Sequence, residues 1–170
     1  MEILKAIKER RTIRNFQKKD IPAEIVDKLV ESLVWAPSAG NLQARKFYFV
    51  KDKGLKEALA SASLDQSFIA DAPLVIVGCT DHEIFKKYRE RGVSLFSIQD
   101  VAASIMGMML VAHENNLGTV WVGSFIDEEV GEILNLPQNL HPVVIVPVGY
   151  PLSIPTTPPR VPAGEAVVFK

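Results

Sequence analysis

The stretch LFSIQDVAASIMGMMLVAHENN, residues 95–116, decides what kind of fold this chain can adopt. Apolar residues at helical spacing mark one face and further apolar residues cover the other faces, which predicts a helix that is hydrophobic nearly all round. Such a helix must be buried on all sides, and one small domain can hardly provide that. We therefore expect a partner subunit to cover one face; a central core helix of a monomer is the alternative. The two sets are Leu95, Ile98, Ala102, Ile105 and Met109 on one face, and Val101, Ala103, Met108, Leu110 and Val111 elsewhere.

The residues around this helix predict strands and shorter helices. Apolar runs of strand length at 73–79, 119–123 and 143–149 are typical of buried central strands. The expected remaining elements are a strand at 46–50 and helices at 2–9, from Pro22 to Pro37, at about 55–62 and at 127–134.

The C-terminal tail has a composition of its own. Five prolines fall between residues 151 and 162, so this part cannot form a helix and is expected to lie extended over another surface. The apolar residues 166–169 that follow are expected to be able to add to a sheet as an edge strand.

Composition limits the class of protein. At 170 residues the chain has the size of one domain, so residues 1–170 are expected to form a single unit with a substantial core. The 19 basic and 20 acidic residues nearly balance, which gives no indication of nucleic-acid binding. Cys79 is the only cysteine, which excludes an internal disulfide framework and argues against a thiolate metal site. The three histidines show no metal-ligand spacing, so no metal is expected.

No targeting segment is expected. The N-terminal residues intersperse acidic and basic side chains without a long apolar core, unlike a secretory signal. The most hydrophobic window, 101–112, is shorter than the roughly 20 residues of a membrane span. We therefore expect a cytoplasmic protein without a membrane partner.

The stretch RRTIR, residues 10–14, points to a bound phosphate. Guanidinium groups match phosphate oxygens with a planar fork of donors and stay charged at every relevant pH. A chain with a net charge of −1 has no general reason to concentrate arginines here. A solvated basic patch is the alternative.

A second stretch, APSAGNLQ at residues 36–43, suits a flat polar ligand. Small residues let the backbone approach closely, and the carboxamides of Asn41 and Gln43 offer both donors and acceptors. The pyrimidine edge of a flavin ring displays the complementary groups. Asn41 could instead only cap the loop.

Recognisable catalytic machinery is absent from the sequence. It holds no GxGxxG after a strand, no phosphate-binding lysine loop and no evident catalytic triad or carboxylate pair. We expect a bound cofactor to supply the chemistry, with no side chain acting as catalytic acid or base. Asp100 is expected only as a hydrogen-bond partner within its helix.

Six segments in order along the chain resemble the nitroreductase family of FMN-dependent oxidoreductases. They are RRTIR, APSAGNLQ, residues 88–100, the long apolar helix, GTVWVG at 118–123 and VPVGYP at 146–151. The resemblance implies an α+β fold with a mixed, largely antiparallel sheet flanked by helices. It also implies a homodimer with two FMN sites at the subunit interface and a tail that extends onto the other subunit.

The resemblance assigns cofactor-binding roles to particular residues. The arginine stretch would hold the phosphate and ribityl chain, the APSAGNLQ loop of the partner chain would flank the ring, and the backbone near Gly123 would point an amide at the reactive ring nitrogen. A basic residue in the tail would close on the phosphate. Tails of the family often carry two basic residues at this position, whereas here Pro158 and Pro159 precede Arg160, so phosphate binding is expected to depend more on the N-terminal arginines. The residues are Arg10, Arg11, Thr12, Arg14, Pro37, Ser38, Asn41, Gln43, Val122, Gly123, Ser124 and Arg160.

The function that the resemblance implies is a ping-pong oxidoreductase. NADH or NADPH would pass hydride through FMN to an oxidised small-molecule acceptor, nitroaromatic or quinone-like, and both substrates would use the same open face of the ring. The alternatives are another chemistry of the family, such as reductive dehalogenation, and a flavin-binding sensor or storage module without its own substrate. The sequence fixes neither the physiological acceptor nor the preference for NADH or NADPH.

Overall fold

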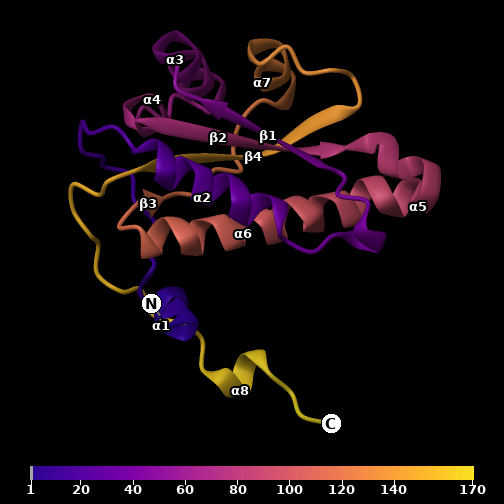
Figure 1. Ribbon diagram of the computed structural model, residues 1–170. Helices are drawn as coiled ribbons and strands as arrows, with labels where there is room; N and C mark the ends of the chain where they lie inside the picture. The colour runs from indigo at the N-terminus through magenta and orange to yellow at the C-terminus, as the bar shows by residue number, and fades with distance from the viewer. Residues whose placement is uncertain (1) are drawn as a thin grey trace.

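A four-stranded antiparallel sheet forms the centre of the computed structural model, which describes residues 2–170 (Figure 1). The strand order is β1-β2-β4-β3. The strands are β1 (Arg45–Val50), β2 (Leu74–Asp81), β3 (Gly118–Thr119) and β4 (Leu140–Gly149). A single parallel bridge, between Thr12 and Thr119, extends the sheet beyond β3 and gives it its mixed character. The expected α+β class is therefore confirmed.

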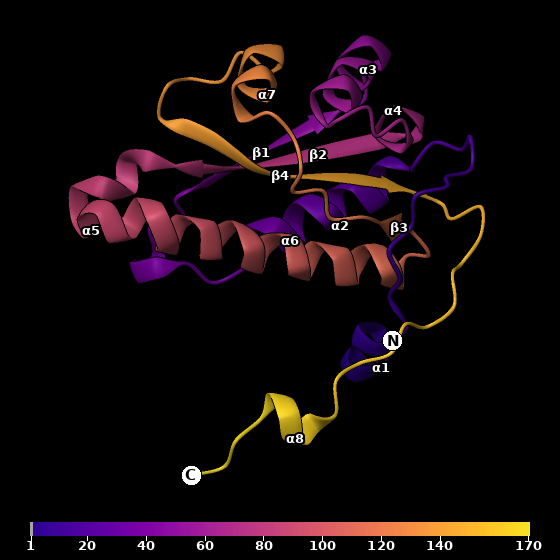
Figure 2. The ribbon, with the colours of Figure 1, turned by 180° about the vertical axis from the view of Figure 1, so that it is seen from behind.

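Helices cover both faces of this sheet (Figures 1 and 2). On one face lie α3 (Lys53–Ala62), α4 (Phe68–Asp71) and α7 (Asp127–Ile133), and on the other lie α2 (Ala23–Val34) and α6 (Ser97–Glu114). Strand β2 contributes residues to the hydrophobic cores on both sides of the sheet, because successive side chains of a strand point to opposite faces. Its Val75 and Val77 join the α3, α4 and α7 side, whereas Leu74 and Ile76 join the α2 and α6 side.

The run at 119–123 was expected to be a buried central strand, and this is wrong. Strand β3 contains two residues and lies at the edge of the sheet, and Val122 adds only an isolated bridge to Ile145. Pro147 of β4 explains the interruption. Its carbonyl accepts from the Val120 N–H at 3.4 Å, but proline has no N–H to return a ladder bond on that side.

The long apolar helix is α6, and it is preceded by further helical turns. A 3₁₀ turn (His82–Ile84), α5 (Phe85–Arg91) and a π-helical turn (Gly92–Phe96) lead into it. By length and composition alone the stretch 82–114 would pass as a membrane span, contrary to the expectation from its most apolar window. Helix α6 packs against α2 and β2, as a core helix does.

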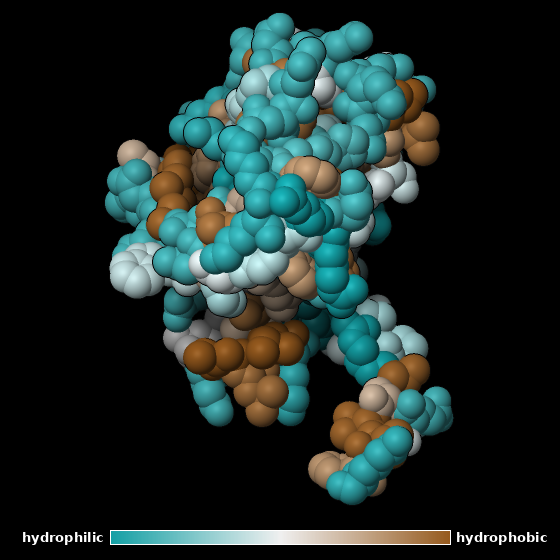
Figure 3. All heavy atoms as spheres, turned by 90° about the vertical axis from the view of Figure 1, so that its right-hand side faces the viewer, coloured by the Kyte–Doolittle hydropathy of each residue, from teal (hydrophilic) through white to brown (hydrophobic). Residues whose placement is uncertain are grey.

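One side of α6 is not covered by the chain itself. The side toward the sheet is buried, including Val101, Ile105 and Met108, but Ile98 and Met106 on the other side are 44% and 37% exposed. Helix α1 (Ile3–Glu9) also presents exposed apolar residues, with Ile3 73% exposed. In Figure 3, hydrophobic side chains gather below the main body, where Figure 1 shows α1 and α8.

The tail leaves the main body in an extended conformation, as its prolines require. A single four-residue turn, α8 (Ala163–Ala166), follows, and residues 167–170 belong to no strand. The expectation of an edge strand at 166–169 is wrong for this chain, because a strand forms only beside another strand and the tail has moved away from the sheet. Phe169 is 94% exposed as a result.

Candidate functional site

The arginine stretch lies alongside the edge of the sheet at the C-terminal end of α6. The Ile13 N–H donates to the Thr119 carbonyl at 3.0 Å, and Thr12 pairs with Thr119 in the parallel bridge. Ile13 is buried, so it anchors the segment while the neighbouring arginines keep contact with the surface. The local alternation of buried and exposed residues thus follows from strand-like pairing.

Positive charge accumulates at this edge without compensation. Burial, then the charges of Arg160 and Arg11, lower the pKa of Arg10. The Arg10 Nε atom is buried and has no hydrogen-bond partner among residues 2–170. Among residues 2–170, the ion pairs are made by lysines and by His141. None of them involves an arginine of the N-terminal stretch or Arg160. An anion bound here would relieve both the repulsion and the unpaired donor.

The other arginines of the stretch are positioned by different contacts. Arg11 donates through Nη1 to the carbonyls of Lys8 at 2.7 Å and Arg10 at 2.9 Å, and through Nη2 to the Thr157 hydroxyl of the tail. The Arg14 guanidinium lies 5.8 Å from the centre of the Phe68 ring. Arg11 therefore connects the extended tail with the N-terminal stretch, and the charge of Arg160 in the same tail acts on Arg10.

The loop Pro37–Gln43 forms a compact turn at the opposite end of α6. Its centre is a 3₁₀ turn, Ala39–Asn41, and Gly40, Asn41 and Gln43 all have φ near +55°. The Ser38 hydroxyl closes the turn by accepting from the Gln43 N–H at 3.0 Å. Glycine adopts this left-handed region freely, and asparagine does so more easily than most residues.

Two residues that were not expected to contact this loop hold it in place. Arg45 donates to the carbonyls of Pro37 at 2.8 Å, Ala36 at 2.6 Å and Val34 at 3.1 Å, so it also completes the C-terminal end of α2. Burial lowers the pKa of Arg45, and the charge of Asp100 opposes that shift. The only available signal in the sequence was an arginine at the start of the following strand.

Asp100 is the second of these residues, and its expected role within the helix is wrong. Its Oδ1 accepts from the Ala39 N–H at 2.9 Å, so it fixes the loop on the first turn of α6. Its Oδ2 is buried without a partner in residues 2–170. The side chain therefore acts between segments, which no local spacing reveals.

The segment Val122–Ser124 lies near the arginine stretch because it continues from β3. The N–H and carbonyl of Val122 both bond to Ile145, at 2.9 and 3.0 Å, whereas Gly123 and Ser124 are exposed. Gln66 Nε2 donates to the Ser124 carbonyl at 3.2 Å and holds the segment from α4's side of the sheet. No motif or spacing in the sequence indicated a role for Gln66.

One chain does not bring the two halves of the expected site together. The loop Pro37–Gln43 is tied to Asp100 at the beginning of α6, whereas the arginine stretch is tied to Thr119, beyond the end of that helix (Figures 1 and 2). Helix α6 has 18 residues, which corresponds to a length of about 27 Å. No single small ligand can contact both halves of the same chain.

Comparison with known proteins defines the family. The model of the nitroreductase family matches residues 7–68 and 60–150. A putative NADH dehydrogenase/NAD(P)H nitroreductase of Archaeoglobus fulgidus is 31% identical over 154 residues, covering 88% of this chain and 86% of the relative. The chain therefore belongs to the nitroreductase family.

Two further proteins are similar over nearly the whole chain. The FMN reductase [NAD(P)H] of Bacillus subtilis is 29% identical over 181 residues, covering 98% of this chain and 72% of the relative. The structure of NfrA2 from B. megaterium superimposes with a TM-score of 0.92 at 27% identity, covering 99% of this chain and 74% of NfrA2.

Proposed function

We propose that the chain is a one-domain, FMN-dependent oxidoreductase that passes hydride from NADH or NADPH to a small oxidised acceptor, nitroaromatic or quinone-like. Membership of the nitroreductase family and similarity to an FMN reductase support this class of enzyme. The observation that carries the proposal for this chain is the uncompensated guanidinium cluster. A phosphate is the group that its charge and geometry fit.

The donors at the arginine stretch suit the FMN phosphate. Arg10 has a buried Nε without a partner, and Arg160 approaches from the tail closely enough to shift the pKa of Arg10. Arg14 lies over an aromatic ring without a carboxylate partner in residues 2–170. We assign these residues, with Arg11 and Thr12, to the phosphate and ribityl chain.

The complete site requires two chains. An isologous homodimer in which the α6 helices run antiparallel would place the Pro37–Gln43 loop of one chain beside the arginine stretch of the other. The exposed apolar faces of α6 and α1 supply a surface suited to such an interface. We assign Pro37, Ser38, Asn41 and Gln43 of the partner chain to the ring.

Bound FMN supplies the hydride-transfer chemistry, and the chain's own groups bind and orient. Carboxamides of Asn41 and Gln43 match the alternating donors and acceptors of a pyrimidine edge. Backbone N–H groups of Gly123 and Ser124, on an exposed segment held by Gln66, would donate to a ring nitrogen. No side-chain acid is needed if solvent provides the proton, and a shared open face accounts for a ping-pong order.

The visible absorption spectrum of the purified protein tests this proposal. We expect a flavin spectrum, FMN released on denaturation, a homodimer in solution and parallel lines in initial-rate plots with varied NAD(P)H and acceptor. A colourless protein that does not take up added FMN would overturn it. Tight FMN retention with slow NAD(P)H oxidation under every acceptor would instead favour a storage or sensor module.

A reducing cytoplasm remains the proposed location. Cys79 is a free thiol buried in the sheet, which requires no oxidising compartment.

A further inference from the structure

A group of cations and aromatic rings on α5 is not used by the site described above. The helix reads FKKYRER, so four basic residues accompany one acidic residue, Glu90. Within residues 2–170, Lys86 is the only one of the four basic residues in an ion pair, with Glu83. The remaining three, Lys87, Arg89 and Arg91, are exposed and have no carboxylate of residues 2–170 within ion-pair distance.

Two of these cations flank a pair of rings. Lys87 Nζ lies 5.5 Å from the centre of the Tyr88 ring, and Arg91 Cζ lies 5.5 Å from the centre of the Phe96 ring. The two rings meet edge to face, with centres 5.2 Å apart and an interplanar angle of 85°. Both rings are half-buried, and each has an exposed cation beside it. We call Lys87, Tyr88, Arg91 and Phe96 the α5 rim.

The α5 rim touches the loop that we assign to the ring. A Cβ atom on Gly40 would collide with the Tyr88 hydroxyl and would lie 3.3 Å from Lys87 Nζ. Gly40 therefore lets the loop approach the rim more closely than any other residue would. Any ligand that projects beyond the loop on this side meets the rim next.

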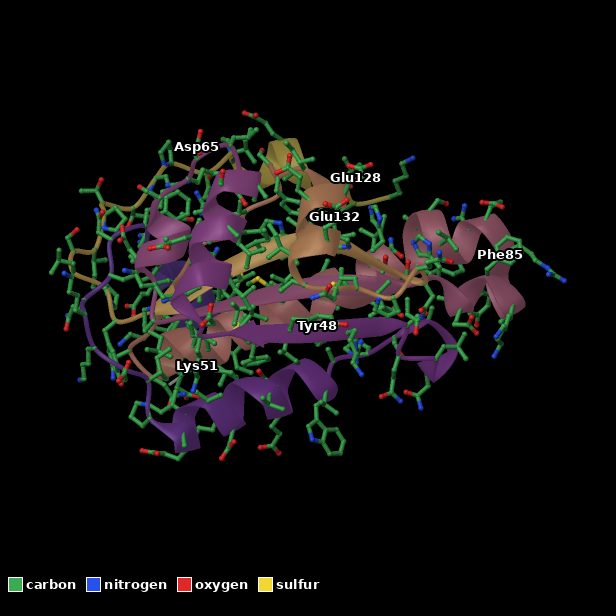
Figure 4. All side chains as sticks on the ribbon, turned by 90° about the horizontal axis from the view of Figure 1, so that it is seen from above. Tyr48, Lys51, Asp65, Phe85, Glu128 and Glu132 are labelled. Carbon is green, nitrogen blue, oxygen red and sulfur yellow. The ribbon has the colours of Figure 1, made fainter. Side chains whose placement is uncertain are left out.

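The backbone beside the rim is strained. Arg89 has φ 51° and ψ −147°, a conformation found almost only for glycine, inside the helical run. Its guanidinium lies 5.7 Å from the centre of the Phe85 ring, at the outer tip of the molecule (Figure 4). Such strain is typical of ligand clamps, and here it breaks α5 immediately after Tyr88.

We propose that the α5 rim binds the adenosine-phosphate half of the nicotinamide donor and favours NADPH over NADH. The purine would lie against Tyr88 and Phe96, and Lys87 and Arg91 would pair with phosphate oxygens, including the additional phosphate of NADPH. The chain has no dinucleotide-binding fingerprint, so the donor needs another surface for this half. This inference rests on the proposed function, because the rim is useful only if the adjoining loop flanks FMN.

The test compares the double variant Lys87→Ala/Arg91→Ala with the wild-type dimer. Equilibrium binding of NADP⁺ and NAD⁺ to the FMN-loaded protein gives a readout that needs no turnover. We expect the dissociation constant for NADP⁺ to rise about tenfold and that for NAD⁺ to rise much less, because fewer phosphate oxygens lose a partner. The ratio of kcat/KM for NADPH to that for NADH should fall by a similar factor, with FMN content unchanged.

Lys86→Ala is the matched control, since it removes one positive charge from the same helix at a residue already paired with Glu83. It should change NADP⁺ binding less than twofold. Tyr88→Phe keeps the ring and should also retain binding, whereas Tyr88→Ala should weaken the binding of both nucleotides.

Three results would overturn the inference. The first is unchanged NADP⁺ binding in the double variant. The second is an equal loss of affinity for NADP⁺ and NAD⁺. The third is a loss of activity with the charged acceptor p-nitrobenzoate but not with nitrobenzene. All three results would be obtained with protein that carries FMN and oxidises NAD(P)H, so they would not contradict the proposed function. Failure of the proposed function would appear earlier, as protein without FMN.

Discussion

The residues around the two ends of α6 differ in how far their polar groups find partners within the chain. At the C-terminal end, guanidinium groups approach one another, the pKa of Arg10 is lowered, and its Nε has no partner in residues 2–170. At the N-terminal end, three carbonyls accept from Arg45, and Asp100 and Ser38 accept from backbone N–H groups of the loop. Under the proposed function a bound phosphate would complete the first end, whereas the contacts of the second end are formed within the chain. Substitutions at the arginine end should therefore weaken ligand binding, whereas substitutions at the loop end should lower the free energy of unfolding.

The largest expected effect is at the arginine end. Replacing Arg10 and Arg14 with alanine removes charge-assisted donors, each worth roughly 1.5–3 kcal/mol, so FMN affinity should fall at least about 100-fold. The dimer should stay folded, because neither side chain makes an ion pair within residues 2–170. Titration of the apoprotein with FMN, followed by fluorescence, measures the change.

Lys53→Ala/Lys86→Ala removes the same number of charges from surface ion pairs elsewhere and is the control. Unchanged flavin occupancy in the arginine variant would show that RRTIR is a solvated basic patch and does not bind the phosphate.

The second effect is at the loop end and concerns folding. Arg45→Ala leaves the carbonyls of Pro37, Ala36 and Val34 without their donor, and we expect a loss of about 2–3 kcal/mol in the free energy of unfolding. Denaturant unfolding at fixed protein concentration gives this value.

Asp100→Asn is the sharper companion variant. It keeps an oxygen for the Ala39 N–H but removes the charge beside Arg45, so it should be milder than Arg45→Ala. An Arg45→Ala protein as stable as wild type would show that the loop does not depend on this anchor.

A smaller effect is expected at Gly40 in the same loop. Alanine at a φ of +55° is strained by about 1 kcal/mol or more, and its Cβ would displace the Tyr88 hydroxyl. We expect modest destabilisation together with weaker NADP⁺ binding. Gly131→Ala in α7 is the counterpart, since its Cβ would enter open space and should stabilise the helix slightly. Equal outcomes at the two glycines would contradict this interpretation.

The smallest expected effect is at Cys79, which is buried in β2 in the core on the α3, α4 and α7 side of the sheet. Burial raises the pKa of its thiol to about 12, so little thiolate forms at pH 8 and disulfide reagents should react only after unfolding. Neither the arginine variant nor Asp100→Asn should accelerate the reaction under native conditions. Rapid labelling in either variant would mean that damage at one end reaches the core.

Most of the fold could be predicted because its signals are local. Apolar runs located β1, β2 and β4, and apolar periodicity with prolines located α2 and α6 to within a few residues. The two strands that were wrongly predicted depend on residues elsewhere in the chain. The short β3 depends on Pro147 in the neighbouring strand, and the fate of residues 166–169 depends on where the tail goes.

The candidate site divides in the same way. Arg10 and Asn41 were singled out by the chemistry of their side chains as well as by resemblance to the family, and Gly123 by resemblance alone. Arg45, Asp100 and Gln66 act across the fold, on groups that are distant in sequence, and spacing cannot show such contacts. The separation of the two halves by α6 is likewise a property of three-dimensional structure alone.

The length of α6 also has a genetic consequence. In a dimer with shared sites, each site takes its arginines from one chain and its loop from the other. A copy damaged at Arg10 and a copy damaged at Asn41 would each be inactive alone, yet together they would form mixed dimers with one intact site and one doubly damaged site. Co-expression of two defective alleles would thus restore part of the activity that each allele alone lacks, and a duplicated gene could divide the two halves between its copies.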